Sequence, residues 1–527
     1  MYVNQMAQFF TQIKRHWQLT AVAALVFIHA FINFIWLSKD TYPLWFDFGG
    51  YFQRSLQIYF AAGCGLKDFF EAVLAVGKYI HSFQPYRVLL PLSTVPWYFL
   101  FGTVGDTAVM SCTVFLAIAL FSTYGITSKL FDKTKGFLAA FFLSVSPEFY
   151  TFYRRYSPEF AATAMIALTA FLLWQSKNFQ SRKYSILAAI SFGLGILAKE
   201  LSFIYIVGIA IYSFYKGMAK KRLCLVNFLI FVFLSAVIAF LFYGLHSNRV
   251  LHNIFNSAYS HAMAQSFHMD ERWSAAGLLF YIKIMFTYGF SLDKSLFFII
   301  GLILFLKNKI PGRGFIFSWL IIPYIFLISL STRASYYGMP LLIPMSMVAA
   351  YGVTEIAKKD MLRRLLVLTM LLIGIFSLLV HTFAVFGSSS LRLLNPGQYN
   401  EFLYPIKEDW KLEEIMDYVR ANAPKREGVL RIHVGANLAP LSAMTLGYVA
   451  TQKKMDADFG GYNVATQDVL SYDFVIVKSG EKQGIFYSVQ QAQELVGELE
   501  KGGFIQLPKK FLLPDYSFLT VYKKKIE

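Results

Sequence analysis

The chain has 527 residues, of which 56% are hydrophobic and only 15% are charged. Such a composition excludes an ordinary water-soluble protein and predicts an integral membrane protein. The 49 Lys and Arg residues outnumber the 31 Asp and Glu residues, giving a formal net charge of +18. Basic residues collect in the cytoplasmic loops of membrane proteins, and no basic face with interleaved aromatic residues stands apart from such loops. Nucleic-acid binding is therefore excluded as the function.

The first apolar run, Leu19 to Leu37, is long enough to cross a bilayer and ends without a small-residue cleavage pattern. We interpret it as a retained anchor. The three cysteines, Cys64, Cys112 and Cys224, have no metal-ligand spacing and predict no disulfide framework.

Eleven apolar runs fit a membrane topology in which the chain starts in the cytoplasm and ends on the extracytoplasmic side. A spanning helix needs about 20 mostly apolar residues, because its backbone polar groups must be paired within the segment. The predicted spans are 19–37, 108–128, 136–152, 159–175, 184–198, 201–215, 225–244, 292–306, 314–330, 338–356 and 365–386.

The distribution of charge sets the orientation of these spans. With the N-terminus inside, the predicted cytoplasmic segments hold nineteen Lys and Arg residues, whereas the short external turns hold four. This asymmetry places the N-terminus in the cytoplasm. The predicted cytoplasmic segments are the pair Lys14 and Arg15 and the loops 129–135, 177–183, 216–222, 307–313 and 358–364.

This topology requires residues 39–105 to form one long external loop. Within this loop, Val88 to Phe101 is apolar, but it has only 14 residues and contains Pro91 and Pro96. We therefore predict an interfacial helix there rather than a further span.

Residues 1–390 are predicted to form a transmembrane module, and residues 391–527 are predicted to form an extracytoplasmic α/β domain. Helical periodicity appears in residues 410–421 and 489–501, and strand patterns in 429–434, 474–478 and 518–522. The fold class expected from the sequence is thus a multi-pass α-helical membrane protein with a C-terminal soluble domain. We expect this domain to act as a lid or docking module.

Asp47 lies about ten residues beyond the first span, in an aromatic stretch that includes Tyr51. Aromatic faces suit sugar rings, and a carboxylate can act as a general base or bind a metal ion. The alternative is an interfacial aromatic belt with a solvated Asp.

A second candidate is the predicted external turn that holds Arg154 and Arg155 between Glu148 and Glu159. Arginine binds phosphate through two parallel hydrogen bonds, and Pro158 starts a helix whose N-terminus favours negative charge. Two readings stay open here, a phosphate site or ion pairs between these arginines and the two glutamates.

Further cations occur where the positive-inside rule would not place them. Lys199 lies between two apolar runs, Arg333 closes an external turn, and Arg87 precedes the predicted interfacial helix. An anionic lipid-linked substrate would explain these external cations. By contrast, His252, His261, His268, Asp270 and Glu271 match no zinc motif and are expected to be solvated loop residues.

The order of these segments resembles the GT-C glycosyltransferases that use polyprenyl-phosphate sugars, specifically glycosyltransferase family 39, which includes protein mannosyltransferases and the aminoarabinose transferase of lipid A. The resemblance covers most of residues 19–390. It rests on Trp45-Phe-Asp47-Phe-Gly-Gly-Tyr51, Val88 to Gly102, Gly136 to Pro147 continuing to Arg155-Tyr-Ser-Pro158-Glu159, Gly193 to Lys199, and Tyr336 to Pro344.

The chain departs from the family pattern at several positions. Glu159 replaces the usual Asp, Phe48 follows Asp47 where the family has an acid, and Tyr336 stands where an Arg is common, although Arg333 could substitute. The segment from His81 to Pro85 lacks an acidic metal ligand that some relatives carry, so a requirement for a divalent metal ion is left open.

The resemblance implies an inverting sugar transfer on the extracytoplasmic face, from a polyprenyl-phosphate donor to a lipid, protein or polysaccharide acceptor. In this hypothesis Asp47 is the general base and Glu159 supports it or binds acceptor or metal. The residues expected to bind substrate are Tyr51, Arg87, Arg154, Arg155, Lys199, Arg333 and Tyr336. The alternatives are a transporter or flippase for a polyprenyl-linked saccharide and a non-catalytic subunit of a glycan assembly complex.

Overall fold

The computed structural model describes residues 2–44, 46–74, 87–218, 221–244, 273–308, 310–357, 359–385, 404–424, 428–461, 466–484 and 487–525. Their contacts define two compact units. The helical unit comprises Met1–Trp36, Tyr86–Leu89 and Met110–Tyr404, and the mixed unit comprises Leu37–Pro85, Leu90–Val109 and Pro405–Glu527. The domain boundary predicted between residues 390 and 391 stays a prediction. Besides the C-terminal part, the mixed unit contains most of residues 39–105, the segment predicted as an external loop.

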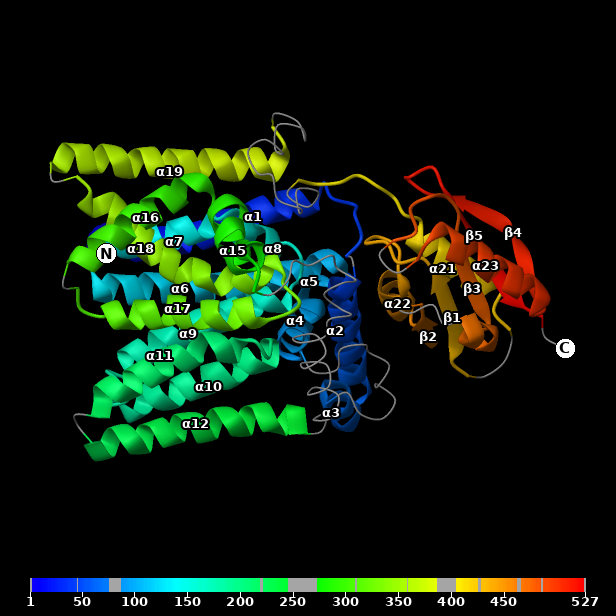
Figure 1. Ribbon diagram of the computed structural model, residues 1–527, viewed down its shortest axis with the longest axis horizontal. Coiled ribbons are helices and arrows are strands. Elements are labelled where there is room, and N and C mark those ends of the chain that lie inside the picture. The colour runs from blue at the N-terminus through cyan, green and yellow to red at the C-terminus, as the bar shows by residue number, and fades with distance from the viewer. Residues whose placement is uncertain are drawn as a thin grey trace. The chain divides into compact units, whose positions relative to one another are not determined.

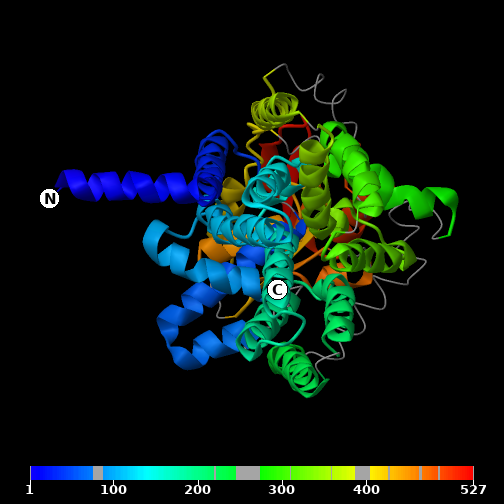
Figure 2. The same ribbon diagram turned by 90° about the vertical axis from the view of Figure 1, so that its left-hand side faces the viewer.

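The helical unit is built from helices that run side by side, and Figure 2 looks along several of them. A π-helical turn, η4 (Met285–Gly289), and a 3-10 helix, η5 (Ser335–Leu341), interrupt the series. Its α-helices are α1 (Tyr2–Leu37), α6 (Thr113–Leu130), α7 (Lys133–Ser144), α8 (Pro147–Tyr153), α9 (Pro158–Gln175), α10 (Arg182–Ala198), α11 (Ser202–Gly217), α12 (Lys221–Tyr243), α15 (Ala275–Ile284), α16 (Leu292–Lys307), α17 (Arg313–Ser329), α18 (Leu342–Glu355) and α19 (Asp360–Phe383).

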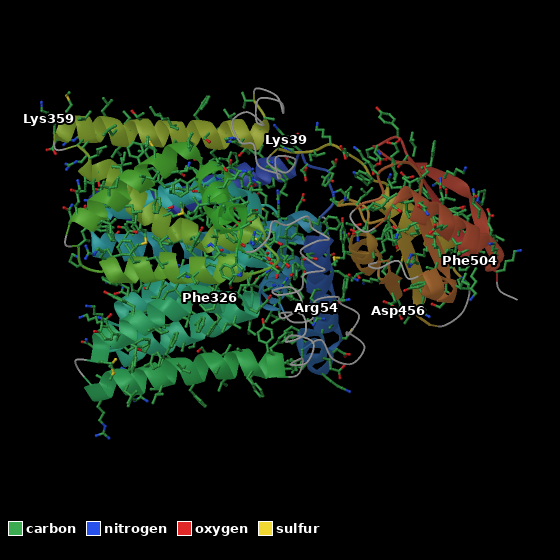
Figure 3. The ribbon with its side chains drawn as sticks, in the orientation of Figure 1. Lys39, Arg54, Phe326, Lys359, Asp456 and Phe504 are labelled. Carbon is green, nitrogen blue, oxygen red and sulfur yellow. The ribbon has the colours of Figure 1, made fainter. Side chains whose placement is uncertain are left out.

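Each of the eleven predicted spans overlaps a helix of the described chain. Among the residues that the structure describes, five helical segments are long and apolar enough to cross a membrane, and a sixth would be if α8 and α9 form one broken span. Apolar side chains are exposed on helices of this unit, such as Phe326 of α17, whereas Lys359 lies where α18 and α19 are joined (Figure 3). The number of crossings and their orientation stay predictions.

The expected uninterrupted helix over 136–152 is wrong. Helix α7 ends at Ser144, and the short α8 starts at Pro147 and is bent by 116° relative to α9. Pro147 lacks an N–H group and disfavours helical geometry at the preceding residue, and Ser146 accordingly has an extended conformation. Arg154 and Arg155 therefore follow a short oblique helix rather than a complete span.

The mixed unit combines helices from the first half of the chain with an α/β fold from its C-terminal part. Its N-terminal helices are α2 (Phe46–Cys64), α3 (Leu66–Leu74), α4 (Leu89–Phe101) and α5 (Gly105–Ser111), of which α4 starts and α5 ends just across a unit boundary. Helix α4 matches the predicted interfacial helix and, with 13 residues, is shorter than a spanning helix needs to be. Its position at the membrane interface stays a prediction.

The C-terminal part forms a five-stranded sheet in the order β2-β1-β3-β5-β4. Strands β1 (Leu430–Gly435), β2 (Ala457–Gly460) and β3 (Phe474–Lys478) are parallel, whereas β5 (Phe518–Lys524) is antiparallel to both β3 and β4 (Phe504–Leu512). The helices of this part are α21 (Leu412–Ala421), α22 (Ala443–Gln452) and α23 (Val489–Lys501). The predicted helices and strands are present, and α22, β2 and β4 are additional.

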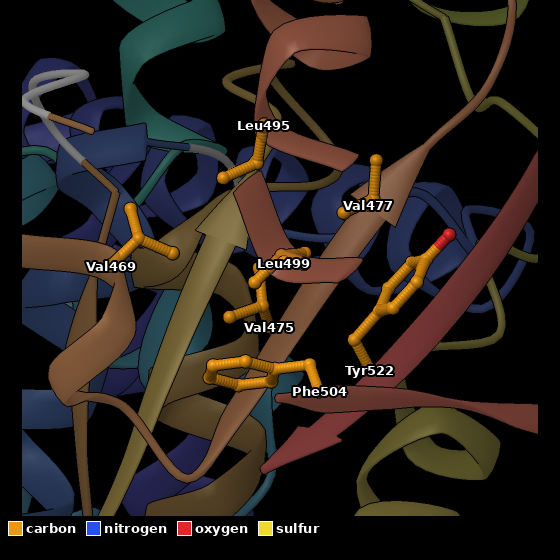
Figure 4. Close-up of a cluster of buried hydrophobic side chains, with 7 residues drawn as sticks. All are labelled: Val469, Val475, Val477, Leu495, Leu499, Phe504 and Tyr522. Carbon is orange, nitrogen blue, oxygen red and sulfur yellow. The ribbon is translucent and has the colours of Figure 1, made fainter. Parts of the chain in front are cut away.

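Apolar side chains from α23 and the strands form the core of this part (Figure 4). Leu495 and Leu499 of α23 pack with Val475 and Val477 of β3, and all four are buried. Helix α23 begins with a capping box in which Ser488 and Gln491 satisfy each other's backbone N–H groups. This cap and the periodic apolar face explain why the helix forms at this position.

The segment that follows α1 is hydrogen-bonded to the start of the C-terminal part. The Asp40 carboxylate accepts a hydrogen bond of 2.7 Å from the backbone N–H of Ile406, and the Thr41 N–H donates to the Ile406 carbonyl at 2.9 Å. Burial, with a smaller contribution from the nearby charge of Asp106, raises the pKa of Asp40 from 3.8 to about 7.

A pH-dependent stability follows from the raised pKa of Asp40. Between pH 4 and 7 the folded protein holds this proton more tightly than the unfolded chain, so folding stability falls as pH rises through that window. Asp40→Asn removes the titration and keeps an oxygen that can accept from Ile406. We expect the wild type to lose about 1–3 kcal/mol more than this variant between pH 4 and 7.

Melting temperatures of the purified full chain in detergent, measured across this pH range, check the prediction. The matched control is Asp456→Asn, because Asp456 is exposed. Parallel pH profiles for wild type and Asp40→Asn would contradict it.

Candidate active site

A buried ion pair lies at the N-terminal end of α9. The Lys199 ammonium, between α10 and α11, pairs with Oε1 of Glu159, and these residues are only 3% and 8% exposed. Ser157 caps α9 by accepting a hydrogen bond from the Glu159 N–H at 3.2 Å, and its hydroxyl donates to Glu159 Oε2 at 2.5 Å. Pro158 at the first helical position explains why the helix starts here. Both carboxylate oxygens of Glu159 therefore have a partner, Lys199 at Oε1 and Ser157 at Oε2.

Arg87 forms a second ion pair beside the first. Its Nη2 donates to Oε1 of Glu200 at 2.8 Å and its Nε to Oε2 at 3.2 Å, a two-point contact. Burial alone would raise the pKa of Glu200, but the charges of Arg87 and Lys199 outweigh it and hold that pKa at about 2. Glu200 is therefore ionised throughout the physiological range.

Tyrosine side chains surround the Lys199 ammonium. Its Nζ lies 5.6 Å from the ring centre of Tyr336 and 5.1 Å from that of Tyr337, within the range of cation–π attraction. The Tyr205 hydroxyl donates to the Tyr337 carbonyl. Glu159, Lys199 and these three tyrosines line a cavity of about 20 Å³. This volume holds about one water molecule, so a sugar could enter only if the lining side chains moved.

The cluster of Arg87, Glu159, Lys199 and Glu200 carries two positive and two negative charges. Ion pairs with the two carboxylates hold both cations in place. The ammonium of Lys199 has three N–H donors, of which its contact with Glu159 uses one. The arrangement can therefore present rigidly held positive groups to an anion.

The other predicted cations lie in different surroundings. Arg154 donates to the Thr382 hydroxyl of α19 at 2.9 Å and lies over the rings of Trp36 and Tyr150, at 5.5 and 5.2 Å. Arg155 lies over Phe152 at 5.0 Å. Lys199 pairs with Glu159, and the charge of Arg155 acts on Glu148. The alternative in which the two arginines pair with Glu148 and Glu159 stays a prediction.

Arg333 is only 2% exposed and lies over the ring of Phe280, at 5.9 Å. The ring of Tyr336 instead connects the site to α8, with its centre 5.2 Å from that of Phe152. Tyr336 and its neighbour Tyr337 are thus the residues of this turn whose rings lie against Lys199.

Asp47 and Tyr51 belong to the mixed unit. Asp47 is in the first turn of α2 and is partly exposed, whereas Tyr51, one turn further along, is 3% exposed. Among the residues that the structure describes, no three His, Cys, Asp or Glu side chains are grouped to hold a metal ion. The predicted loop residues His252, His261, His268, Asp270 and Glu271, and the segment 81–85, lie outside the described residues.

No site role was predicted from the sequence for Glu200, Tyr205 or Tyr337. Glu200 follows Lys199 between two apolar runs, and that unusual position was the available signal. Tyr205 and Tyr337 lie within apolar or aromatic segments, where nothing distinguishes them from ordinary packing residues.

Comparison with known proteins gives a partial family match. Residues 97–244 match the model of the dolichyl-phosphate-mannose-protein mannosyltransferase family. This segment includes Arg154, Glu159 and Lys199. A comparison with curated proteins gives no match.

Three solved structures share the fold over most of this chain. ArnT from Cupriavidus metallidurans, bound to undecaprenyl phosphate, has a TM-score of 0.60 at 11% identity, covering 95% of this chain and 97% of that chain. The oligosaccharyltransferase AglB from Archaeoglobus fulgidus, in complex with an inhibitory peptide and a dolichol-phosphate, has a TM-score of 0.58 at 12% identity, with coverages of 88% and 69%. The arabinofuranosyltransferase AftD from Mycobacteria has a TM-score of 0.56 at 11% identity, with coverages of 97% and 40%.

The predicted resemblance to the GT-C glycosyltransferases is confirmed by the family match and by the shared fold. The fold class is confirmed in its coarser form, that of a helical protein with the fold of these glycosyltransferases and with several helices apolar enough to cross a membrane. Because the identity is only 11–12%, the similarity to these solved structures is evidence for the fold alone.

Proposed function

We propose that this chain is a glycosyltransferase that moves a sugar from a polyprenyl-phosphate donor to a lipid, protein or polysaccharide acceptor on the extracytoplasmic face. The observation that carries the proposal is the fixed Lys199 ammonium beside a cavity, held by Glu159 and faced by tyrosines. It occurs within the segment that matches the mannosyltransferase family. The fold is shared with a protein bound to undecaprenyl phosphate.

In the proposed reaction the acceptor hydroxyl oxygen attacks the anomeric carbon of the donor sugar. The bond from that carbon to the phosphate oxygen breaks, and its electron pair leaves with the polyprenyl phosphate. The proton of the acceptor hydroxyl passes to Asp47, the proposed general base. Attack from the face opposite the phosphate gives inversion.

The leaving phosphate needs positive groups that are already in place. Lys199 and Arg87 meet this requirement, because ion pairs with Glu159 and Glu200 hold them in place. Glu159 then acts through Lys199, as a positioning residue. We propose that Tyr336 and Tyr51 contact the sugar and that Arg154, Arg155 and Arg333 contribute positive potential to the donor site.

The test is a transfer assay on the purified full chain in detergent. Synthetic polyprenyl phosphates carrying pentoses, hexoses or amino sugars are supplied with candidate acceptors, and free polyprenyl phosphate and glycosylated acceptor are measured. We expect release of polyprenyl phosphate in equal amount to the sugar transferred. Intact donor with every sugar and acceptor would contradict the proposal.

The rival function, transport of a polyprenyl-linked saccharide, gives a different result in the same system. A flippase reconstituted in vesicles moves the intact donor across the bilayer and releases no polyprenyl phosphate. Adding the donor to one leaflet and measuring both quantities therefore separates the two functions.

A further inference from the structure

The α/β part at the C-terminus is packed directly against helix α2, which carries Asp47. Both lie in the mixed unit. The contact is made by α22, the helix that connects the parallel strands β1 and β2. Because α22 starts with a capping box formed by Ser442 and Thr445 and is buried along most of its length, it gives α2 a firm surface.

Small residues bring the two helices together. A Cβ atom added to Gly49 of α2 would lie 2.8 Å from the Leu44 carbonyl oxygen and 3.1 Å from the ring of Tyr448. A Cβ added to Gly447 of α22 would lie 3.1 Å from Oε1 of Gln53. Both distances are shorter than an ordinary van der Waals contact, so these glycines permit the close approach.

Directional contacts set the register of α2 on α22. The amide of Gln53 donates to the Thr451 hydroxyl at 3.1 Å. One residue earlier on α2, the ring of Phe52 lies 5.1 Å from that of Tyr448, and both rings are buried. A shift of α2 along α22 would break the hydrogen bond and separate the rings.

The chain on the other side of Asp47 is attached to the same part of the protein. Asp40 and Thr41 bond to Ile406, as described above, and the Thr41 hydroxyl also donates to the Glu408 carbonyl at 3.4 Å. Asp47 therefore lies between two attachments in sequence, at residues 40–41 and 49–53. A carboxylate that removes a proton must be held to within a fraction of an ångström, and these two attachments restrain its position.

We infer that the C-terminal α/β part is the platform that positions Asp47, with Gln53, Tyr448 and Thr451 as positioning residues at the contact between α2 and α22. The inference rests on the proposed function, in which Asp47 is the general base. It gives the C-terminal part a role in the chemical step, different from the lid or docking module expected from the sequence.

The test compares two glycine substitutions in the same α/β part. Gly447→Leu places a bulky side chain against α2, whereas Gly497→Leu on α23 adds one where nothing lies within 4 Å. We expect Gly447→Leu to speed hydrogen exchange of the α2 amides and to lower kcat at least 10-fold, with the KM for the donor nearly unchanged. Gly497→Leu should match the wild type in both measurements.

A finer pair of variants tests the hydrogen bond itself. Thr451→Ser keeps the hydroxyl that Gln53 bonds, and Thr451→Val keeps the size but removes the hydroxyl. We expect Thr451→Ser to retain kcat and Thr451→Val to lose about 5- to 10-fold, since a hydrogen bond contributes about 1 kcal/mol. A larger loss of kcat in Thr451→Ser than in Thr451→Val would show that Thr451 acts through packing, and would overturn its positioning role.

The two readouts separate this inference from the proposed function. If the wild type transfers no sugar, the proposed function fails, while hydrogen exchange still shows whether α22 holds α2. Unchanged α2 exchange in Gly447→Leu overturns the inference, and so does faster exchange with an unchanged kcat.

Discussion

Replacing Lys199 by methionine is expected to destabilise the protein by about 3–5 kcal/mol and to reduce sugar transfer by roughly 10²- to 10³-fold. The two effects have different causes. The loss of stability comes from the Glu159 carboxylate, which is 8% exposed and would lose its partner charge. The loss of transfer comes from the missing positive charge at the leaving phosphate.

The double variant Lys199→Met with Glu159→Gln separates these causes. It removes both charges, and the glutamine oxygen can still accept from the Ser157 hydroxyl. We expect the melting temperature to return most of the way to that of the wild type, while transfer stays as low as in Lys199→Met. Recovery of transfer in the double variant would show that the pair has only a structural role.

A matched control shows what an exposed ion pair contributes in the same unit. Arg363 and Asp360 pair at 2.6 Å on α19, with side chains 46% and 72% exposed. Such pairs contribute at most about 1 kcal/mol, because water screens them and two long side chains must be ordered. Arg363→Met is therefore expected to leave both melting temperature and transfer close to those of the wild type.

The helices that overlap the eleven predicted spans could be predicted from the sequence because the signal for each is local. A run of apolar residues requires internally paired backbone groups, and the run itself gives the approximate ends. The same reasoning fails at Pro147, where one residue without an N–H group divides an otherwise continuous apolar segment into α7 and α8. Apolar composition alone gives no warning of such a break.

The missed elements of the C-terminal part have specific explanations. Strand β4 contains Pro508 and two lysines and would be rejected as a central strand, but it lies at the edge of the sheet, where a missing N–H group is tolerated. Its register also shifts between Gln506 and Lys510. Strand β2 has only four residues, which is too short for an alternating pattern to be recognised.

The candidate site could be predicted only as a set of residue types. Lys199 and Glu159 were selected because charges are rare at the ends of apolar helices. Their pairing joins residues 40 positions apart, and the pairing of Arg87 with Glu200 joins residues 113 positions apart. The contact between Gln53 and Thr451 spans 398 positions. No local pattern encodes such contacts, because they depend on how the whole fold assembles.

Asp47→Asn is expected to lower kcat by about 10²- to 10⁴-fold, the range over which a positioned general base accelerates a reaction. The substitution preserves size, and Asp47 is partly exposed in the first turn of α2, so folding should be little affected. The KM for the donor should change little, since the base acts on the acceptor hydroxyl rather than on the phosphate. Steady-state kinetics of the purified chain with a saturating acceptor measures both constants.

The control is Asp68→Asn, because Asp68 also lies in the first turn of a helix, α3, in the same unit. The interaction of such a carboxylate with the N-terminus of its helix contributes a few tenths of a kcal/mol to about 1 kcal/mol of stability. Normal kcat in Asp68→Asn together with a large loss in Asp47→Asn would therefore assign the effect to proton transfer. Near-normal kcat in Asp47→Asn would exclude Asp47 as the base. Glu159 could not simply replace it, because that carboxylate is already bound by Lys199 and Ser157.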